Sequence, residues 1–245
     1  MQNGNGKGCL YGVGVGPGDP ELLTLKAVRV LQSADVVVAP QAETSDESLA
    51  LAVVRDYLDL SSQEVVYAPF SMGVETGGVE TDEAWGRVAN AIAGHLKRGR
   101  NVAFLTLGDP MLYGSFIHVM DKVLMAVPDA PVEVVPGVSS ISAAAAAALL
   151  PIVSHRERLA VLPSVHGVED LRQVLDQFDT VVLMKVNRKA VEAVAQIERE
   201  GGLERCVFVR RATTEREKVV RSARELTPDD LDYFSMLTLS APRVK

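Results

Sequence analysis

The chain has 245 residues, of which 47% are apolar and 23% are charged, a composition typical of a folded globular protein with one large domain or two smaller ones. Its formal net charge is −7, and no basic stripe stands out, so nucleic acid is not an expected partner. The longest weakly polar stretch, residues 141–153, is broken by Pro151 and is too short to span a bilayer. The first eight residues lack the apolar core of a signal peptide, which favours a cytoplasmic protein.

Strand and helix patterns alternate along the chain. Asp19 and Pro20 follow the first apolar run as a cap and a first-turn residue, and apolar side chains then recur at helical spacing. We expect helices at residues 20–32, 48–58, 80–98, 115–125, 139–150, 168–175 and 188–200. We expect strands at residues 9–15, 35–39, 64–67, 102–107, 132–135, 159–162, 181–184, 207–211 and 234–239. This alternation predicts an α/β fold with largely parallel pairing.

A turn between two prolines, at residues 128–131, is the best candidate for a domain junction. It divides the chain into an N-terminal α/β domain, residues 1–128, and a C-terminal α/β domain, residues 129–245. Cys9 and Cys206 lie in apolar runs and are expected to be buried, reduced thiols. The four histidines have no metal-ligand spacing, so no metal site is expected.

The Gly-rich turn at residues 12–20 does not match the dinucleotide fingerprint G-x-G-x-x-G. Counted from Gly12 the sixth residue is Pro17, and counted from Gly14 it is Asp19. A nicotinamide-linked oxidoreductase is therefore disfavoured. The turn itself is open to two interpretations, a tight turn with a capped helix or a loop that lets a ligand approach the backbone.

A second turn, Gly-Asp-Pro at residues 108–110, follows an apolar strand. Asp109 either caps the next helix or binds a cationic ligand group. Ser139 and Ser140 open an Ala-rich segment, where they either cap a helix or present N–H groups to a ligand. Met184 ends another apolar strand, where it is either a core residue or a ligand contact.

Taken together, these pieces resemble the tetrapyrrole methylases. The matching segments are residues 12–20 and 22–27, 108–110, 135–140, 183–184, 211–213 and 234–239. The resemblance implies two α/β domains with mixed, largely parallel sheets and a ligand trough between them, a homodimer, and S-adenosylmethionine as methyl donor. It implies cofactor contacts at Pro17, Gly108, Asp109, Leu112, Tyr113, Ser139, Ser140, Met184, Ala212 and Leu239.

Within the family, residues 7–20, 109–116 and 233–236 are most similar to the branch that methylates precorrin-2 at ring carbon 20 in cobalamin biosynthesis. The branch acting on uroporphyrinogen III would be expected to have Tyr-Asp-Arg-Leu after the second strand, where this chain has Ala-Pro-Gln-Ala at residues 39–42. One alternative stays open, in which the substrate ring already carries cobalt. Two further alternatives are weaker: a tetrapyrrole-binding module without catalysis and, more distantly, a nicotinamide-linked oxidoreductase.

Methylation of a nucleophilic ring carbon by direct displacement needs mainly positioning and exclusion of water from the protein. No catalytic residue is assigned. The substrate that the resemblance implies carries many carboxylates, so cations are expected to face it. The candidates are Arg156, Lys185, Arg188, Arg210 and Arg211. Hand-over of the product to the next enzyme of the pathway is also expected.

Overall fold

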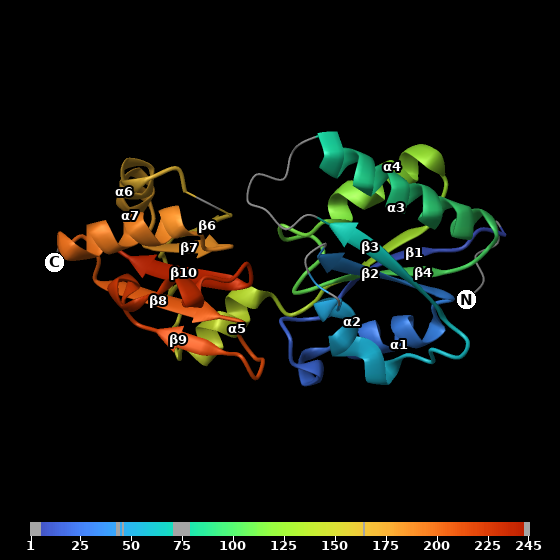
Figure 1. Cartoon of the computed structure of the whole chain (residues 1–245), viewed down its shortest axis with the longest axis horizontal. Coiled ribbons are helices and arrows are strands. Elements are labelled where there is room, and N and C mark those ends of the chain that lie inside the picture. The colour runs from blue at the N-terminus through green and yellow to red at the C-terminus, as the bar shows by residue number, and fades with distance from the viewer. Residues whose placement is uncertain (1–5, 43–44, 46, 71–78, 164, 243–245) are drawn as a thin grey trace. The chain divides into compact units, whose positions relative to one another are not determined.

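The computed structural model describes residues 6–42, 45, 47–70, 79–163 and 165–242. It divides into two compact units, Met1–Ser140 and Ile141–Lys245 (Figure 1). Each unit contains one five-stranded sheet. The expected α/β fold with two domains is therefore confirmed at the level of its sheets. No helix in the described part of the chain has the length and apolarity needed to cross a membrane.

The sheet of the first unit is wholly parallel. Its strands are β1 (Leu10–Gly14), β2 (Val36–Ala42), β3 (Glu64–Phe70), β4 (Val102–Thr106) and β5 (Val132–Val135). They lie in the order β3-β2-β4-β1-β5. The register places Gly14 of β1 beside Thr106 of β4, and Val13 beside Val135 of β5. The loops that follow these three strands therefore begin side by side at one edge of the sheet.

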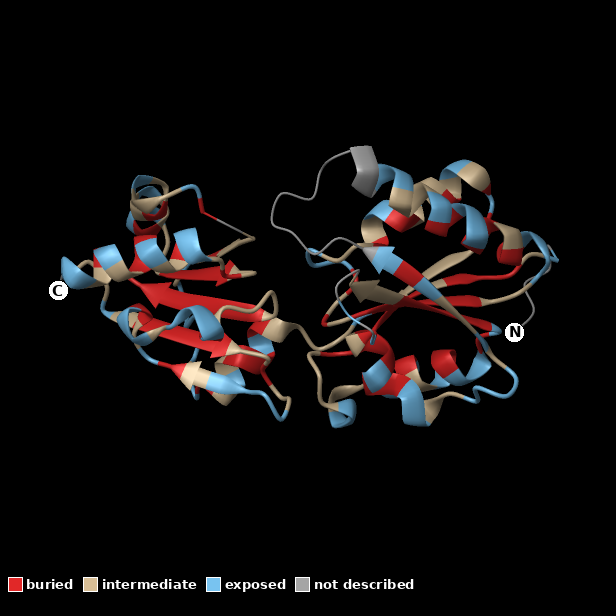
Figure 2. Cartoon of the chain, viewed as in Figure 1, coloured by how far each residue is buried: buried red, intermediate tan, exposed pale blue. Residues whose placement is uncertain are grey.

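Helices cover both faces of this sheet. The helices are α1 (Leu25–Ser33), α2 (Leu49–Val54), α3 (Val79–Lys97) and α4 (Phe116–Ala126), with short 3-10 turns at Pro20–Leu22 and Arg55–Tyr57. Side chains of β4 alternate between the faces, so that Leu105 packs with α1 and α2 whereas Phe104 packs with α3 and α4. Figure 2 shows the strands as the most buried layer, which is why they read as continuous apolar runs.

The first helix differs from its prediction. Asp19 caps only the 3-10 turn Pro20–Leu22, because Leu23 is extended and interrupts the helix. The side chain of Thr24 then caps α1. Leu25, one of the apolar side chains that recur at helical spacing, is the first residue of α1 and is 84% exposed.

The boundary between the units also differs from the expected one. The division falls after Ser140, whereas the turn between the two prolines predicts it after residue 128. The reason is that β5 pairs in parallel with β1 and so belongs to the first sheet. The next helix, α5 (Ser140–Ala147), begins at the division.

The second unit contains a mixed sheet. Its strands are β6 (Leu159–Leu162), β7 (Thr180–Met184), β8 (Arg205–Arg210), β9 (Lys218–Val220) and β10 (Ser235–Ser240), in the order β6-β7-β10-β8-β9. β6 and β7 are parallel, and the other pairings are antiparallel. α5 packs on one face, and α6 (Val168–Gln177) and α7 (Arg188–Arg199) pack on the other. Short 3-10 turns lie at Ala223–Glu225 and Pro228–Asp230.

Both cysteines are free and buried, as expected. Burial raises the pKa of each thiol, and it raises the pKa of Cys206 to about 12. The nucleophilic thiolate form is therefore scarce near neutral pH, and we assign no chemistry to either residue.

Asp230 stabilises the second unit. Its side chain, 4% exposed, accepts hydrogen bonds from the backbone N–H of Thr227 at 3.0 Å, from the Thr227 hydroxyl at 2.9 Å and from the Lys218 ammonium. The Lys218 ammonium, followed by the Thr227 backbone N–H, lowers the pKa of Asp230 to about 2. Because the pKa is below its ordinary value, this contribution to stability is present above about pH 4 and is lost as the pH falls through about 2.

We therefore expect Asp230→Asn to lower the free energy of unfolding by about 1–3 kcal/mol at neutral pH, since one partner of a buried charged network is removed. The deficit should shrink towards about pH 2, where the wild-type carboxyl is itself protonated. Urea denaturation of both proteins at neutral pH and at about pH 2 measures the difference in free energy of unfolding. Asp229→Asn, at an exposed neighbouring carboxylate, is the matched control. A deficit independent of pH would contradict the assignment.

Candidate functional site

The loops after β1 and β4 are joined directly to each other. The backbone N–H of Gly108 donates to the carbonyl of Gly16 at 2.7 Å, and Gly16 donates to Gly108 at 3.4 Å. Both glycines have positive φ, 76° at Gly16 and 72° at Gly108, a conformation that glycine adopts without strain. The two Gly-Asp-Pro turns of the sequence thus form one structure at the carboxyl edge of the sheet.

The loop after β5 packs against these two turns so closely that side chains are excluded. A Cβ atom on Gly137 would lie 2.1 Å from the carbonyl oxygen of Gly108, and one on Gly14 would lie 2.5 Å from the backbone nitrogen of Gly137. Distances of this kind to backbone atoms leave no room for any residue but glycine at either position. In open α/β sheets, ligands bind outside the carboxyl ends of the strands, where loops of this kind meet.

Asp109 ties the loops together. One carboxylate oxygen accepts a hydrogen bond from the backbone N–H of Met111 at 2.9 Å, and the other accepts from Gly137 at 3.1 Å. The first bond closes a local turn, and Asp109 does not cap the next helix, because α4 begins only at Phe116 with Ser115 at its cap position. The second bond links the loop after β4 to the loop after β5 and could not be inferred from local sequence.

Apolar side chains are exposed immediately after this turn. Met111 is 51% exposed, Leu112 36% and Tyr113 43%. Pro17 follows Gly16 in the neighbouring loop, and Ser139 and Ser140 lie where the third loop enters α5. The structure therefore brings the predicted residues of the first unit to one edge, where apolar surface adjoins polar backbone, as in small-molecule sites.

Thr106 was not singled out from the sequence. It ends β4, is only 7% exposed, and its hydroxyl has no hydrogen-bond partner among the described residues. A buried hydroxyl without a partner in a native structure calls for a ligand atom or a water. The sequence gives little indication of a ligand contact at Thr106, because threonine is common in β-strands for its strand propensity alone.

In the second unit, three strands contribute to one edge of the sheet. β10 is antiparallel to β7 and β8, and its register places Met236 beside Met184 and Ser235 beside Arg210. The carboxyl ends of β7 and β8 therefore meet the start of β10. Ala212, buried at 6% exposure, follows β8 at the same edge.

Backbone strain is concentrated at the predicted residues. Six non-glycine residues in the described part of the chain have positive φ, and they are Tyr113, Leu149, His155, Lys185, Arg211 and Thr213. Four of the six adjoin predicted cofactor contacts: Tyr113 follows Leu112, Lys185 follows Met184, and Arg211 and Thr213 flank Ala212. Each such conformation costs about 1–3 kcal/mol and typically persists where a site requires it.

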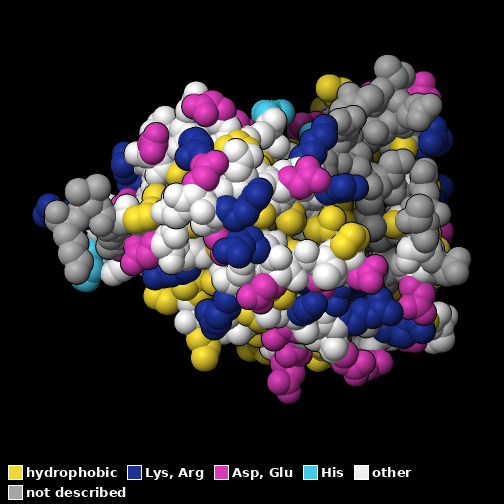
Figure 3. Space-filling view, turned by 60° about the vertical axis from the view of Figure 1, so that its left-hand side comes forward, with side chains coloured by type: hydrophobic (Ala, Val, Ile, Leu, Met, Phe, Trp, Pro, Cys, Tyr) yellow, Lys and Arg dark blue, Asp and Glu magenta, His cyan; other side chains and the backbone are white. Residues whose placement is uncertain are grey.

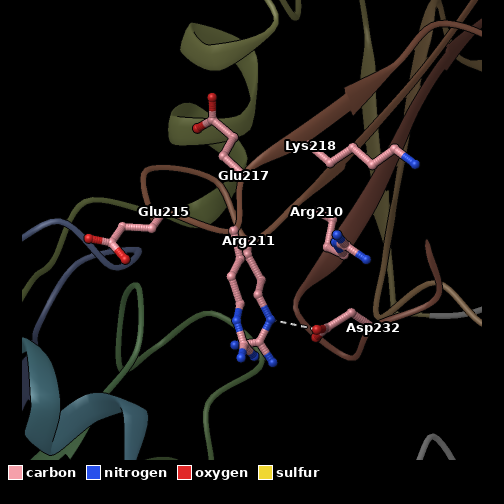
Figure 4. A pocket seen from close by; sticks show the side chains of 7 residues that line it. Arg210, Arg211, Glu215, Glu217, Lys218 and Asp232 are labelled. Carbon is pink, nitrogen blue, oxygen red and sulfur yellow. Dashed lines mark hydrogen bonds and ion pairs between the residues drawn. The ribbon is translucent and has the colours of Figure 1, made fainter. Parts of the chain in front are cut away.

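Cations and carboxylates line an open pocket beside β8. It is formed by Arg210, Arg211, Glu215, Arg216, Glu217, Lys218 and Asp232. Figure 4 shows Arg211 and Asp232 pointing toward one another, with Arg211 Nε donating to the carboxylate at 2.5 Å. Arg210 instead donates to the backbone carbonyl of Asp229 at 2.9 Å. On the face that Figure 3 shows, Lys and Arg side chains are interspersed with Asp and Glu.

Some predicted residues do not reach this edge. Leu239 pairs with Val181 and Cys206 near the opposite edge of the sheet, and it is fully buried in the core beneath α6 and α7. Its side chain leaves no surface for a ligand. Arg156 precedes β6, whose first residue pairs with Thr180, again at the opposite edge. Both residues were misplaced for the same reason, because the direction of each strand in this mixed sheet cannot be inferred from the local sequence.

Arg188 is close in sequence to Lys185 but is engaged on its own helix. Its Nε donates to Glu192 at 2.8 Å, one turn along α7, and its side chain is 85% exposed. Such surface pairs contribute little to stability. Of the five predicted cations, Lys185, Arg210 and Arg211 are the ones the structure brings to the edge where β7 and β8 end and β10 begins.

Comparison with known proteins assigns the family. The model of the tetrapyrrole (corrin/porphyrin) methylases matches residues 9–227. A cobalt-precorrin-2 C(20)-methyltransferase of Salmonella typhimurium is 36% identical, over 96% of this chain and 97% of its own. A precorrin-2 C(20)-methyltransferase of a Sinorhizobium species is 35% identical, over 96% of both chains.

Solved structures of tetrapyrrole methyltransferases have a similar fold. Uroporphyrin-III C-methyl transferase of Thermus thermophilus, complexed with S-adenyl homocysteine, superposes with a TM-score of 0.66 at 28% identity, covering 95% of this chain and 92% of its own. The cobalt precorrin-4 methyltransferase CbiF shares the fold, with a TM-score of 0.70 at 24% identity, covering 95% of this chain and 94% of its own. The chain belongs to the family of tetrapyrrole (corrin/porphyrin) methylases.

Proposed function

We propose that this protein transfers a methyl group from S-adenosylmethionine to ring carbon 20 of precorrin-2, as a step in cobalamin biosynthesis. The observation that carries the proposal is the similarity to C(20)-methyltransferases, which extends over nearly the full length of the chain at 35–36% identity. One such relative is named for the cobalt-bearing ring and another for the metal-free ring. Metal-free precorrin-2, giving precorrin-3A, is our first choice of substrate, and cobalt-precorrin-2 is the alternative.

The residues of the first unit fit the methyl donor. S-adenosylmethionine combines a sulfonium and an ammonium cation with a carboxylate and with apolar carbon groups. The Asp109 carboxylate suits the cations, the unpartnered Thr106 hydroxyl offers a hydrogen bond, and Leu112 supplies apolar surface. The relative crystallised with S-adenyl homocysteine supports the choice of this cofactor.

When bound, S-adenosylmethionine supplies an electrophilic methyl group on a good leaving group. The chain's own part is to position the reactants and to exclude water. In the first unit we assign cofactor contact to Pro17, Gly108, Asp109, Leu112, Tyr113, Ser139 and Ser140. Met184 and Ala212, at the edge of the second sheet, stay predicted cofactor contacts. Lys185 and Arg211 are the cations best placed for the carboxylates of the ring.

The experiment is an anaerobic incubation of the purified protein with S-adenosylmethionine and either freshly prepared precorrin-2 or its cobalt form. Mass spectrometry of the ring reports the number of methyl groups gained. A gain of one methyl on the metal-free ring supports the first choice, and a gain on the cobalt ring alone supports the alternative. No gain on either ring, with ring binding preserved and no binding of S-adenosylmethionine by calorimetry, would favour a binding module without catalysis.

The resemblance further suggests a cytoplasmic homodimer that passes its product to the next enzyme. Support for self-association comes from an apolar surface after α5, where Leu149 is 89% exposed and Val153 is 41% exposed. Large exposed apolar side chains grouped together are typical of interaction sites.

We therefore expect Leu149→Asp to shift the protein from dimer to monomer in sedimentation velocity, because a charge would have to be desolvated in the interface. Met125→Asp, at another side chain that is 81% exposed but lies on α4, is the matched control and should leave the dimer intact. A wild-type protein that sediments as a monomer, or a dimer insensitive to Leu149→Asp, would contradict this surface.

A further inference from the structure

Two consecutive aromatic residues, Tyr233 and Phe234, precede β10 at the edge of the second sheet. Their rings pack edge to face, with centroids 5.2 Å apart and planes at 82°. Aromatic residues make up only 5% of the chain, and these two rings are partly exposed rather than part of the core.

Each ring carries one cation. The Lys185 ammonium lies 5.0 Å from the centroid of Tyr233, and the Arg211 guanidinium carbon lies 5.5 Å from the centroid of Phe234. Both distances are within the range at which a cation is attracted to the face of a ring. Lys185 comes from the end of β7 and Arg211 from the end of β8, so the aromatic pair brings together cations from two different strands.

Arg211 is fixed at further points. Its Nε donates to one carboxylate oxygen of Asp232 at 2.5 Å, and its backbone N–H donates to the carbonyl of Phe234 at 2.8 Å. The other carboxylate oxygen of Asp232 accepts from the backbone N–H of Phe234 at 2.9 Å. Figure 4 shows the bond between Arg211 and Asp232. None of these bonds uses the two terminal nitrogens of the guanidinium, which form the fork that binds a carboxylate in a bidentate manner.

Lys185 is held by its ring and not by an acid. Among the described residues, no carboxylate lies within ion-pairing distance of its ammonium, whereas Lys7, Lys26, Lys122 and Lys218 each pair with one. An aromatic face holds a cation without neutralising it, so the full charge stays available to an anion.

We propose that Tyr233 and Phe234 are positioning residues, which hold Lys185 and Arg211 as a matched pair of cations for carboxylate groups of the substrate. The inference rests on the proposed function, in which the substrate is a ring bearing many carboxylates. It assigns to the aromatic pair a role in substrate affinity and none in binding the methyl donor.

The test is a double-mutant cycle on Tyr233 and Lys185, with KM for the ring, kcat, and calorimetric affinity for S-adenosylmethionine as readouts. Tyr233→Leu should raise KM about fivefold and leave the affinity for S-adenosylmethionine as in the wild type, because one ring–cation contact is lost. Tyr233→Phe, which keeps the aromatic face, should restore the wild-type KM. In a Lys185→Gln background, Tyr233→Leu should have no further effect. The same cycle applies to Phe234→Leu with Arg211→Gln.

Tyr57→Leu, the same chemical change at a half-buried tyrosine of the first unit, is the matched control. An unchanged KM in Tyr233→Leu would overturn the proposal. So would an equal rise in KM caused by Tyr233→Leu in the wild-type and the Lys185→Gln backgrounds, because Tyr233 would then act on the substrate without Lys185. If Tyr233→Leu does not fold, Lys185→Gln alone still decides whether this cation contributes.

Failure of this proposal is distinguishable from failure of the proposed function. If the wild-type protein methylates neither ring, the methyltransferase assignment fails. Uroporphyrin, a stable ring with the same kind of carboxylate side chains, then serves as the probe in a fluorescence titration. Weaker binding by Lys185→Gln and Tyr233→Leu, with Tyr233→Phe near the wild type, supports the aromatic positioning. Equal binding by all variants contradicts it.

Discussion

Replacing Gly137 by alanine is expected to lower the free energy of unfolding by about 3 kcal/mol or more. The added Cβ would lie 2.1 Å from the carbonyl oxygen of Gly108 and 2.9 Å from the backbone of Gly14, so backbone from two other loops would have to move. Because those loops follow β4 and β1, we also expect the variant to lose affinity for S-adenosylmethionine. Chemical denaturation and calorimetry measure the two effects.

Gly86→Ala provides the control. Gly86 lies in α3, and a Cβ there meets no atom within 4 Å. Alanine has the higher helix propensity, so this variant should be more stable by about 0.5–1 kcal/mol. Equal behaviour of the two variants, or wild-type stability of Gly137→Ala, would show that the loops do not pack as the structure has them.

Asp109→Asn is expected to weaken binding of S-adenosylmethionine at least tenfold, about 1.4 kcal/mol. The carboxylate accepts from two backbone N–H groups, those of Met111 and Gly137, whereas an amide has one acceptor oxygen and would turn an NH₂ group toward the second donor. The loop after β4 would lose its link to the loop after β5, and the negative charge near the ligand cations would be removed.

A matched change is available outside the site. Asp59 makes a similar local turn, accepting from the backbone N–H of Ser61 at 3.1 Å, but it lies in an exposed loop. Asp59→Asn should leave the affinity for S-adenosylmethionine unchanged. The assignment of Asp109 would be withdrawn if both variants bound the cofactor like the wild type while remaining folded.

Most of the secondary structure could be predicted because the strands are buried on both faces and read as apolar runs. The short strand β9 was missed, since Lys218–Val220 has three residues and begins with an exposed lysine. The interruption at Leu23 was missed too, because the apolar spacing before and after it fits one helix. In both places the local residue pattern is too short to be distinguished from the pattern of the flanking segments.

The two turns of the candidate site could be recognised from sequence because they depend on turn chemistry. The Gly-Asp-Pro turns at residues 16–20 and 108–110 can be found from sequence because glycine, aspartate and proline have specific backbone roles. That these turns bond to each other depends on the strand order β4-β1-β5, which no local pattern gives. In the same way, the antiparallel direction of β10 brings Tyr233 and Phe234 to the edge of the second sheet and takes Leu239 away from it.

Methyl transfer to one particular ring carbon is the activity to be tested most directly. We would incubate the protein anaerobically with precorrin-2 and S-adenosylmethionine labelled with carbon-13 in its methyl group, and record the carbon-13 NMR spectrum of the isolated ring. We expect a single labelled methyl group on carbon 20. A labelled methyl on any other carbon, or an unlabelled ring from both the metal-free and the cobalt substrate, would contradict it.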